Sequence, residues 1–160
     1  MKKIVYIAAA CAVTAVVGVQ LALPDSAIRL TPSHAPLLAG AQVAPNVASI
    51  IERSCQNCHS LKTEWPLYSR IYPFSRVVED DVATARGHMN LSRWQSYDNS
   101  EKSALLSEIG SVVRNHVMPP RRYTLVHPDA KLSDAEANRI YQWTRTERHL
   151  LQSSEEPPVE

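Results

Sequence analysis

Residues 55–60 of the chain read CQNCHS, two cysteines with two residues between them and a histidine directly after the second. The stretch continues an apolar pattern that begins several residues earlier. One helix face, with the spacing i, i+3, i+4, i+7, i+8 and i+11, is formed by Val47, Ile50, Ile51, Ser54, Cys55 and Cys58. Pro45 suits the first position of such a helix. The sequence therefore predicts that both cysteines lie on the apolar face of a helix that begins at Pro45.

The composition around this helix favours an all-α fold. The chain has 160 residues, the size of one ordinary domain, and 44% of them are hydrophobic, enough for a packed core. Four glycines, a single phenylalanine and no alternating run of β-branched residues argue against a sheet. Apolar residues recur with helical spacing over residues 73–89 and 100–116, and a capping box of Ser133 and Glu136 predicts the start of a last helix.

The charge of the chain excludes one class of partner. The formal net charge is only +1, and the basic residues are scattered along the sequence. A nucleic-acid-binding protein needs a broad positive surface, which this distribution does not provide. We therefore expect no nucleic-acid partner.

The N-terminus predicts the compartment. Lys2 and Lys3 precede an apolar run over residues 4–23, about the length that a helix needs to cross a hydrocarbon core of roughly 30 Å. The two lysines are expected to stay in the cytoplasm and to direct the rest of the chain outward. We therefore predict that residues 1–23 are a signal anchor or transmembrane helix that is retained in the inner membrane, with cleavage as a signal peptide as the alternative, and that the remaining chain lies in the periplasm.

The segments on either side of the predicted domain look unstructured. Residues 24–44 contain three prolines among polar residues, which predicts a flexible Pro-rich tether. Residues 153–160 read SSEEPPVE, which predicts a disordered acidic tail. The domain itself is expected over residues 45–152.

The CxxCH motif can now be weighed against its alternatives. A zinc site needs a second ligand pair, and Cys11 of the N-terminal apolar run is the one remaining cysteine. A redox dithiol needs a strand before its helix, and none is predicted here. A structural disulfide remains possible in an oxidising compartment. On an exported chain, however, Cys-x-x-Cys-His is the attachment signature of haem c. We expect one covalently attached haem, held by the thiols of Cys55 and Cys58, with His59 as an axial ligand of its iron.

The sixth ligand of that iron has several candidates. They are Met89, Met118, His88, His116, His127 and His149. Met118 is favoured because the two prolines that follow it stiffen the loop that would carry the ligand. Met89 ends an apolar helix face, where core packing is the expected role. A second histidine, or an open sixth position, stays an alternative.

Further motifs carry a resemblance. Trp65 and Pro66 follow the CxxCH motif, and two spaced elements come later: Asn90-x-Ser92-x-Trp94 and Met118-Pro119-Pro120-x-x-Tyr123. Over residues 45–150 this order resembles the bacterial haem-binding domain family of small single-haem c-type cytochromes. The resemblance implies a small helical fold around one haem, like that of class I c-type cytochromes, an N-terminal membrane anchor and electron transfer. One departure is Ala85 before Arg86, where we expect glycine.

The neighbours of the motif allow three further hypotheses. The carbonyl of Pro66 or Pro73 would orient the outer nitrogen of the axial histidine. His127 would brace the Met118 loop, a role that rests on the resemblance. The arginines directly after that loop, Arg121 and Arg122, would surround the haem edge and steer an acidic redox partner.

The expected function follows from the ligation. An iron bound on both sides leaves little room for substrate, so we expect an electron carrier that exchanges single electrons with unidentified redox proteins, and not an enzyme. The alternative is a sensor or enzyme that binds a gas or peroxide at an open or labile sixth position. A structural haem domain in a larger complex is a third hypothesis. No acid/base pair, catalytic triad or phosphate loop in the sequence indicates a separate catalytic centre.

Overall fold

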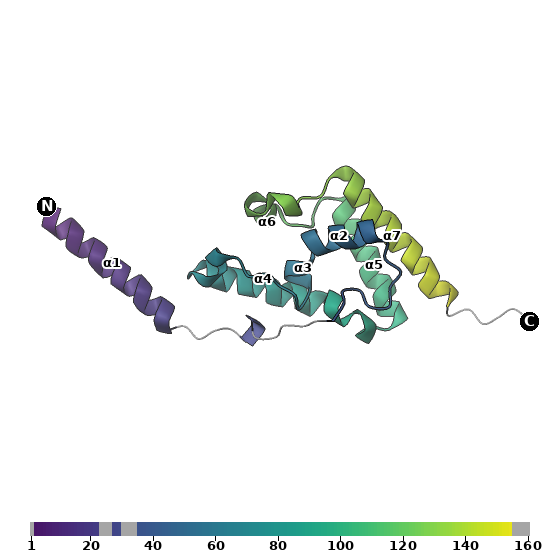
Figure 1. Ribbon diagram of the computed structural model, residues 1–160, viewed down its shortest axis with the longest axis horizontal. Helices are drawn as coiled ribbons and strands as arrows, with labels where there is room; N and C mark the ends of the chain where they lie inside the picture. The colour runs from purple at the N-terminus through teal and green to yellow at the C-terminus, as the bar shows by residue number, and fades with distance from the viewer. Residues whose placement is uncertain (1, 23–26, 30–34, 155–160) are drawn as a thin grey trace, which may run out of the picture.

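The structure is a computed structural model that describes residues 2–22, 27–29 and 35–154 (Figure 1). Every regular element in these ranges is helical, which confirms the predicted all-α class. In chain order the elements are α1 (Lys2–Ala22), η1 (Ala27–Arg29), α2 (Pro45–Ser54), α3 (Gln56–His59), η2 (Leu67–Arg70), α4 (Phe74–His88), η3 (Leu91–Ser96), α5 (Asn99–Arg114), α6 (Arg121–Val126), η4 (Pro128–Ala130) and α7 (Asp134–Ser153).

The core lies where α5, α7 and α2 meet. Leu106 of α5 and Ile140 of α7 are completely buried, and Ile50 and Ile51 of α2 pack into the same cluster. Gly110 allows the close approach of α5 to α7. An added Cβ at Gly110 would lie 2.7 Å from Oγ1 of Thr144, well inside van der Waals contact. Figure 1 shows α5 and α7 side by side, with α2 packed beside them.

Local signals determine most helix boundaries. Helix α7 starts after the predicted capping box of Ser133 and Glu136. Helix α5 starts after a second capping box, in which Asp98 and Glu101 satisfy each other's backbone amides, one position before the start that we expected. Helix α2 starts at Pro45 as predicted. It ends sooner than its apolar pattern indicates, because the backbone of Cys55 leaves the helical region with φ of −123° and divides the predicted helix into α2 and α3.

The structure gives residues 35–44 a different role from the predicted tether. Leu38 is buried, and its amide donates to the carbonyl of Leu91 at 2.9 Å. The indole of Trp143 donates to the carbonyl of Gln42 at 3.0 Å, and the amide of Gln42 donates to the carboxylate of Glu147. This part of the predicted tether therefore packs on the domain. Residues 24–26 and 30–34 of the tether, and residues 155–160 of the predicted acidic tail, lie outside the described residues.

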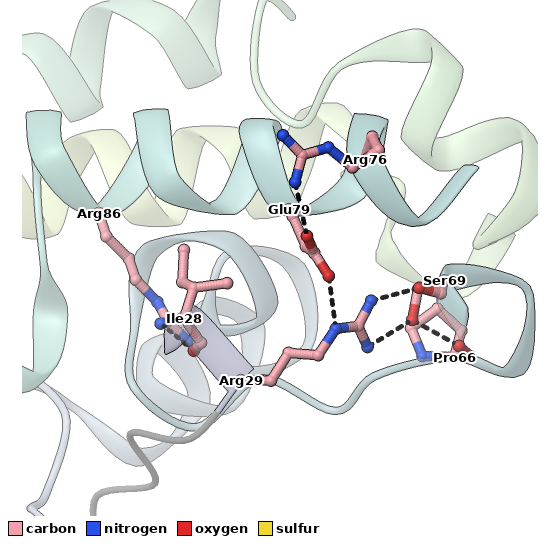
Figure 2. Close-up of polar contacts among 7 residues, drawn as sticks. All are labelled: Ile28, Arg29, Pro66, Ser69, Arg76, Glu79 and Arg86. Carbon is pink, nitrogen blue, oxygen red and sulfur yellow. Dashed lines mark hydrogen bonds and ion pairs between the residues drawn. The ribbon is translucent and has the colours of Figure 1, made fainter. Parts of the chain in front are cut away.

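Element η1 is fastened to the same domain, as Figure 2 shows. The guanidinium of Arg29 donates to the carboxylate of Glu79 on α4 at 2.7 Å and to the backbone carbonyl of Ser69 on η2. It also lies over the ring of Trp65, 4.3 Å from the centroid. Next to it, Arg86 donates to the carbonyl of Ile28 at 3.1 Å. The side chains of Arg29 and Glu79 are only 14% and 11% exposed, so this ion pair is largely shielded from solvent.

The apolar N-terminal run forms helix α1. Among the helices that the structure describes, however, none combines the length and the apolarity needed to cross a membrane. The prediction of a transmembrane helix over residues 1–23 is therefore not supported. Lys2 and Lys3 open the helix, and Thr14 and Gly18 interrupt its apolar run.

Candidate functional site

A cavity of about 340 Å³ brings the predicted site residues together. Cys55, Cys58 and His59 line it together with Met118. Most of the rest of its lining is apolar and comes from α2, from α4 and the segment that follows it, from the start of η3, and from α5 and α7, including Ile51, Ala85, Met89, Leu91, Leu105, Ile109, Val112, Val113, Ile140 and Trp143. Ligand pockets in proteins have roughly this size and character. The cavity is therefore the candidate binding site.

The loop after the second cysteine is fastened by side chains of other elements. Arg86 of α4 donates to the carbonyl of Ser60 at 2.7 Å and to the hydroxyl of Thr63 at 2.8 Å. Thr63 in turn donates to the carbonyl of Asn57, between the two cysteines, at 2.7 Å. Ser60 is completely buried. These contacts hold the CxxCH segment in place against α4.

His59 is oriented as a metal ligand would be. Its Nδ1 lies 3.2 Å from the backbone carbonyl oxygen of Met89, and since a carbonyl can only accept, Nδ1 carries the proton. The lone pair of the neutral ring is then on Nε2, which is free to bind iron. Burial lowers the pKa of His59 below its usual value, and this also favours the neutral imidazole. The structure assigns the orienting carbonyl to Met89, and not to Pro66 or Pro73 as we expected.

The two cysteines are free thiols that line the same cavity. Burial raises the pKa of Cys55 to about 12, and it also raises the pKa of Cys58. Both thiols are therefore protonated and uncharged at neutral pH. Uncharged thiols suit an apolar cavity that must admit a large hydrophobic group.

The Met118 loop starts at a well-defined helix end. The amide of Val117 donates to the carbonyl of Val112 and the amide of His116 donates to that of Val113, the two bonds of a Schellman motif. His116 occupies the left-handed position of this motif, with φ of 54°. The amide of Met118 also donates to the carbonyl of Val112, at 3.2 Å. Helix α5 therefore positions Met118 directly, and 37% of the Met118 surface stays exposed.

The other ligand candidates are engaged elsewhere. His88 lines the cavity, but its Nε2 lies 2.9 Å from the carboxylate of Glu108. His116 pairs with Asp134 at 3.3 Å. His116, His127 and His149 do not line the cavity. Met89 is buried in the core, in agreement with its expected packing role, although its side chain also reaches the cavity wall.

A polar cluster that the sequence did not predict joins the CxxCH segment to α6. The side-chain amide of Asn57 donates to the hydroxyl of Tyr123 at 3.1 Å. The ring of Tyr123 stacks on His127, with 4.4 Å between centroids, and Nε2 of His127 lies 2.7 Å from the hydroxyl of Tyr68. His127 therefore packs against the helix that follows the Met118 loop. Asn57 carries no sequence signal for this role, since the contact depends on a residue 66 positions away.

The donor set and the cavity fit a haem. An apolar cavity contains two thiols, a neutral imidazole whose Nε2 is available, and a thioether. Imidazole and thioether are ligands that haem iron takes in cytochromes. Arg122 at the cavity edge is held by Asp81 at 2.6 Å.

Part of the chain is similar to an enzyme. Over 100 residues it is 29% identical to the cytochrome c peroxidase Ccp of Escherichia coli (strain K12). The matched region is 61% of this chain and 22% of that protein, so the chain spans about a fifth of the length of this relative. The match corrects our expectation that the chain is not an enzyme, because it points toward catalytic activity. That expectation required an iron with both axial positions occupied. It therefore assumed that Met118 stays bound to the iron.

No solved structure matches the chain. The family comparison, in contrast, covers most of it. The model of the family described as haem-binding domain matches residues 14–146, which include the CxxCH segment, the whole cavity lining and the Met118 loop. The chain therefore belongs to the haem-binding domain family.

Proposed function

We propose that the chain binds one haem c, attached covalently through Cys55 and Cys58 with His59 and Met118 as axial ligands, and that it transfers single electrons. The observation that carries this proposal is the presence of these four residues in one apolar cavity. When bound, the haem would supply an iron that changes between its ferric and ferrous states.

The side chains of the chain would have distinct roles at this site. The Met89 carbonyl keeps the proton of His59 on Nδ1 and so leaves Nε2 as the ligand atom. The apolar lining excludes water from the buried side of the cavity, while the exposed part of Met118 gives a partner access to its edge. A thioether ligand raises the reduction potential relative to a second imidazole. Met118 would therefore make the site a better electron acceptor.

We further propose that this electron transfer serves the reduction of a peroxide. Two observations favour this role: the similarity to a cytochrome c peroxidase and the 37% exposure of Met118 on a loop. If the Met118 thioether moves away, a peroxide gains an open position beside the cavity. Cleavage of its O–O bond to give two water molecules would take two electrons from a redox protein, one at a time, and two protons from the solvent.

The periplasm remains the proposed location. Haem c attachment motifs belong to exported chains, and export signals begin with basic residues followed by an apolar stretch. Lys2, Lys3 and the apolar residues of α1 meet that requirement. Redox proteins are the proposed partners, and the net charge of +1 makes nucleic acid a poor one.

Covalent attachment is tested by producing the full chain in a periplasm with c-type maturation enzymes. The expected product is coloured, and its intact mass exceeds that of the polypeptide by one haem. Cys55→Ser and Cys58→Ser variants are expected to lose one thioether link each. A colourless product with the mass of the bare polypeptide would contradict the proposal.

The role of Met118 is tested by absorption spectroscopy and peroxide turnover. The oxidised protein should show the weak near-infrared band of methionine-bound iron, and Met118→Ala should lose it. If peroxide reduction requires an open position, Met118→Ala should also consume hydrogen peroxide faster than the unmodified protein, with a reduced small cytochrome as electron donor. Equal or slower turnover in the variant would argue against the peroxide role and leave electron transfer standing.

A further inference from the structure

Exposed apolar side chains outside α1 are concentrated on one part of the domain. Seven of them lie on two short stretches, residues 67–77 and 121–126. We call this set the apolar face: Leu67, Ile71, Tyr72, Phe74, Val77, Leu125 and Val126. Leu67 and Leu125 are 78% and 81% exposed. Monomeric proteins seldom place so many large apolar residues together in solvent, so the face indicates an interaction.

The two stretches of the apolar face lie next to each other. A hollow of about 540 Å³ is lined by Phe74 and Val77 from the first stretch and by Val126 from the second. The hydrogen bond between Tyr68 and His127 bridges the same two parts of the chain. The two stretches of the apolar face therefore meet at this hollow. None of the seven residues of the face lines the haem cavity, but the hollow adjoins that cavity, because both are lined by Asn57, Cys58, Asp81, Arg122 and Tyr123.

The charged residues within the two stretches are all basic, although Glu64 and Asp81 also line the hollow between the stretches. The two stretches read LYSRIYPFSRV and RRYTLV and together contain four arginines and no acidic residue. Arg122 pairs with Asp81, and Arg76 lies 3.9 Å from Glu79. Arg70 and Arg121 form no ion pair within the described part of the chain and are exposed. Aromatic and aliphatic side chains interspersed with arginine are typical of protein surfaces that enter the headgroup region of an anionic bilayer.

The N-terminal segment leaves the domain beside this face. Arg29 binds the carbonyl of Ser69, which lies between Leu67 and Ile71 in the sequence. Six residues of the sequence lie between Arg29 and Ala22, the last residue of the apolar helix α1. In Figure 1, α1 stands apart from the domain, on the side where α4 begins. Seven large apolar side chains of α1 are exposed as well.

We propose that the apolar face lies on the surface of an anionic lipid bilayer. A single lipid surface would cover both the face and the apolar side chains of α1, which are tied to one end of the domain. Leu67, Phe74 and Leu125 would enter the headgroup boundary, and Arg70 and Arg121 would contact anionic headgroups. The contact needs no membrane-spanning helix.

The proposal is tested with the full chain and vesicles of phosphatidylcholine, with and without 30% phosphatidylglycerol (a fraction of about one third gives a strong surface charge). Hydrogen exchange separates the apolar face from α1, because each segment is followed by its own amides. Residues 67–77 and 121–126 should become protected when the vesicles contain phosphatidylglycerol. Protection confined to α1 would overturn the proposal.

A matched pair of variants tests the contact further. Leu125→Asp on the apolar face should lower the affinity for the vesicles at least about tenfold, where affinity is measured by the protection of residues 67–77 and 121–126. Leu150→Asp on α7 makes the same change at an exposed leucine away from the face and should leave this affinity unchanged. Both positions are exposed, so circular dichroism should show an intact fold in each. Equal losses in the two variants would overturn the proposal. Protection that appears without lipid would also overturn the proposal. If it appears as the protein concentration rises, the face binds a second copy of the chain. If it appears when a redox protein is added, the face binds a protein partner.

Discussion

The Nδ1 atom of His59 and the backbone carbonyl oxygen of Met89 are 3.2 Å apart. Met89 follows α4 directly, and its own amide is bound to the carbonyl of Ala85 at 2.9 Å, so the end of α4 determines where this acceptor lies. The orientation of the proposed axial ligand thus depends on a helix that contributes no ligand of its own. Met89 consequently supports the proposed site through its backbone carbonyl and its packing, and Met118 would support it through its sulfur.

Met89→Ala is expected to act on stability. The side chain is 8% exposed and packs in the core, so the truncation should lower the free energy of unfolding by about 2–4 kcal/mol. The near-infrared methionine band of the haem-loaded protein should persist. Met118→Ala should show the opposite pattern, with the band lost. Urea unfolding and absorption spectra of both variants check this prediction. Loss of the band in Met89→Ala, with the band kept in Met118→Ala, would make Met89 the axial ligand and Met118 the residue without that role.

Local patterns predicted the parts of the fold that depend on neighbouring residues. The capping box at Ser133, the proline start of α2 and the helical spacing of apolar residues that includes Cys55 and Cys58 are all such patterns. The Met118 loop was predicted from the same kind of pattern, because two consecutive prolines are a local signal.

The remaining features depend on contacts between distant residues. Residues 35–44 looked like a tether from their prolines, but Leu38 fills a core position next to Leu91. The acceptor for His59 is a backbone carbonyl 30 residues away, and any residue type can supply a carbonyl. The break at Cys55 interrupts a helix pattern that shows no breaking residue. Tertiary packing overrides local preference at these points.

Gly110→Ala is expected to destabilise the packing of α5 on α7. The new Cβ would lie 2.7 Å from Oγ1 of Thr144 and 3.2 Å from Cδ2 of Tyr141, so the helices must shift apart. Overpacking of this kind costs about 1–3 kcal/mol, which exceeds the gain of roughly 1 kcal/mol in helix propensity. Gly87→Ala in α4 is the matched control, because no atom lies within 4 Å of its added Cβ. It should stabilise the protein by up to about 1 kcal/mol. Thermal unfolding of both variants should move in opposite directions, and equal shifts would contradict the packing argument.

Glu136 should contribute to the acid sensitivity of the fold. Hydrogen bonds from the Ser133 backbone, and then from Arg53, lower its pKa from the usual 4.5 to about 2. A lowered pKa in the folded state means that the carboxylate stabilises the fold above about pH 4.5. This contribution is lost as the pH falls from there toward 2.

The variant Glu136→Gln should therefore be less stable than the unmodified protein at pH 7 and should approach it at pH 3. Urea unfolding at pH 7, 4.5 and 3 measures the difference. Glu52→Gln is the control, because Glu52 is exposed on α2 and forms no ion pair among the described residues. A stability difference that stays constant with pH would show that the carboxylate of Glu136 is not the titrating group.

The pair of Arg29 and Glu79 should be the strongest single attachment of the N-terminal segment to the domain. Removal of Arg29 leaves the carboxylate of Glu79 in a site where it is only 11% exposed, and an unpaired buried charge costs about 3–5 kcal/mol. Arg29→Ala should approach the lower end of this range and should also expose the chain before Pro45 to proteases. Arg76→Ala is the matched control, because Arg76 is 62% exposed and 3.9 Å from the same carboxylate. Such a surface pair contributes less than about 1 kcal/mol. Urea unfolding together with limited proteolysis distinguishes the two arginines, and similar losses in both variants would mean that burial of the Arg29 pair has no special weight.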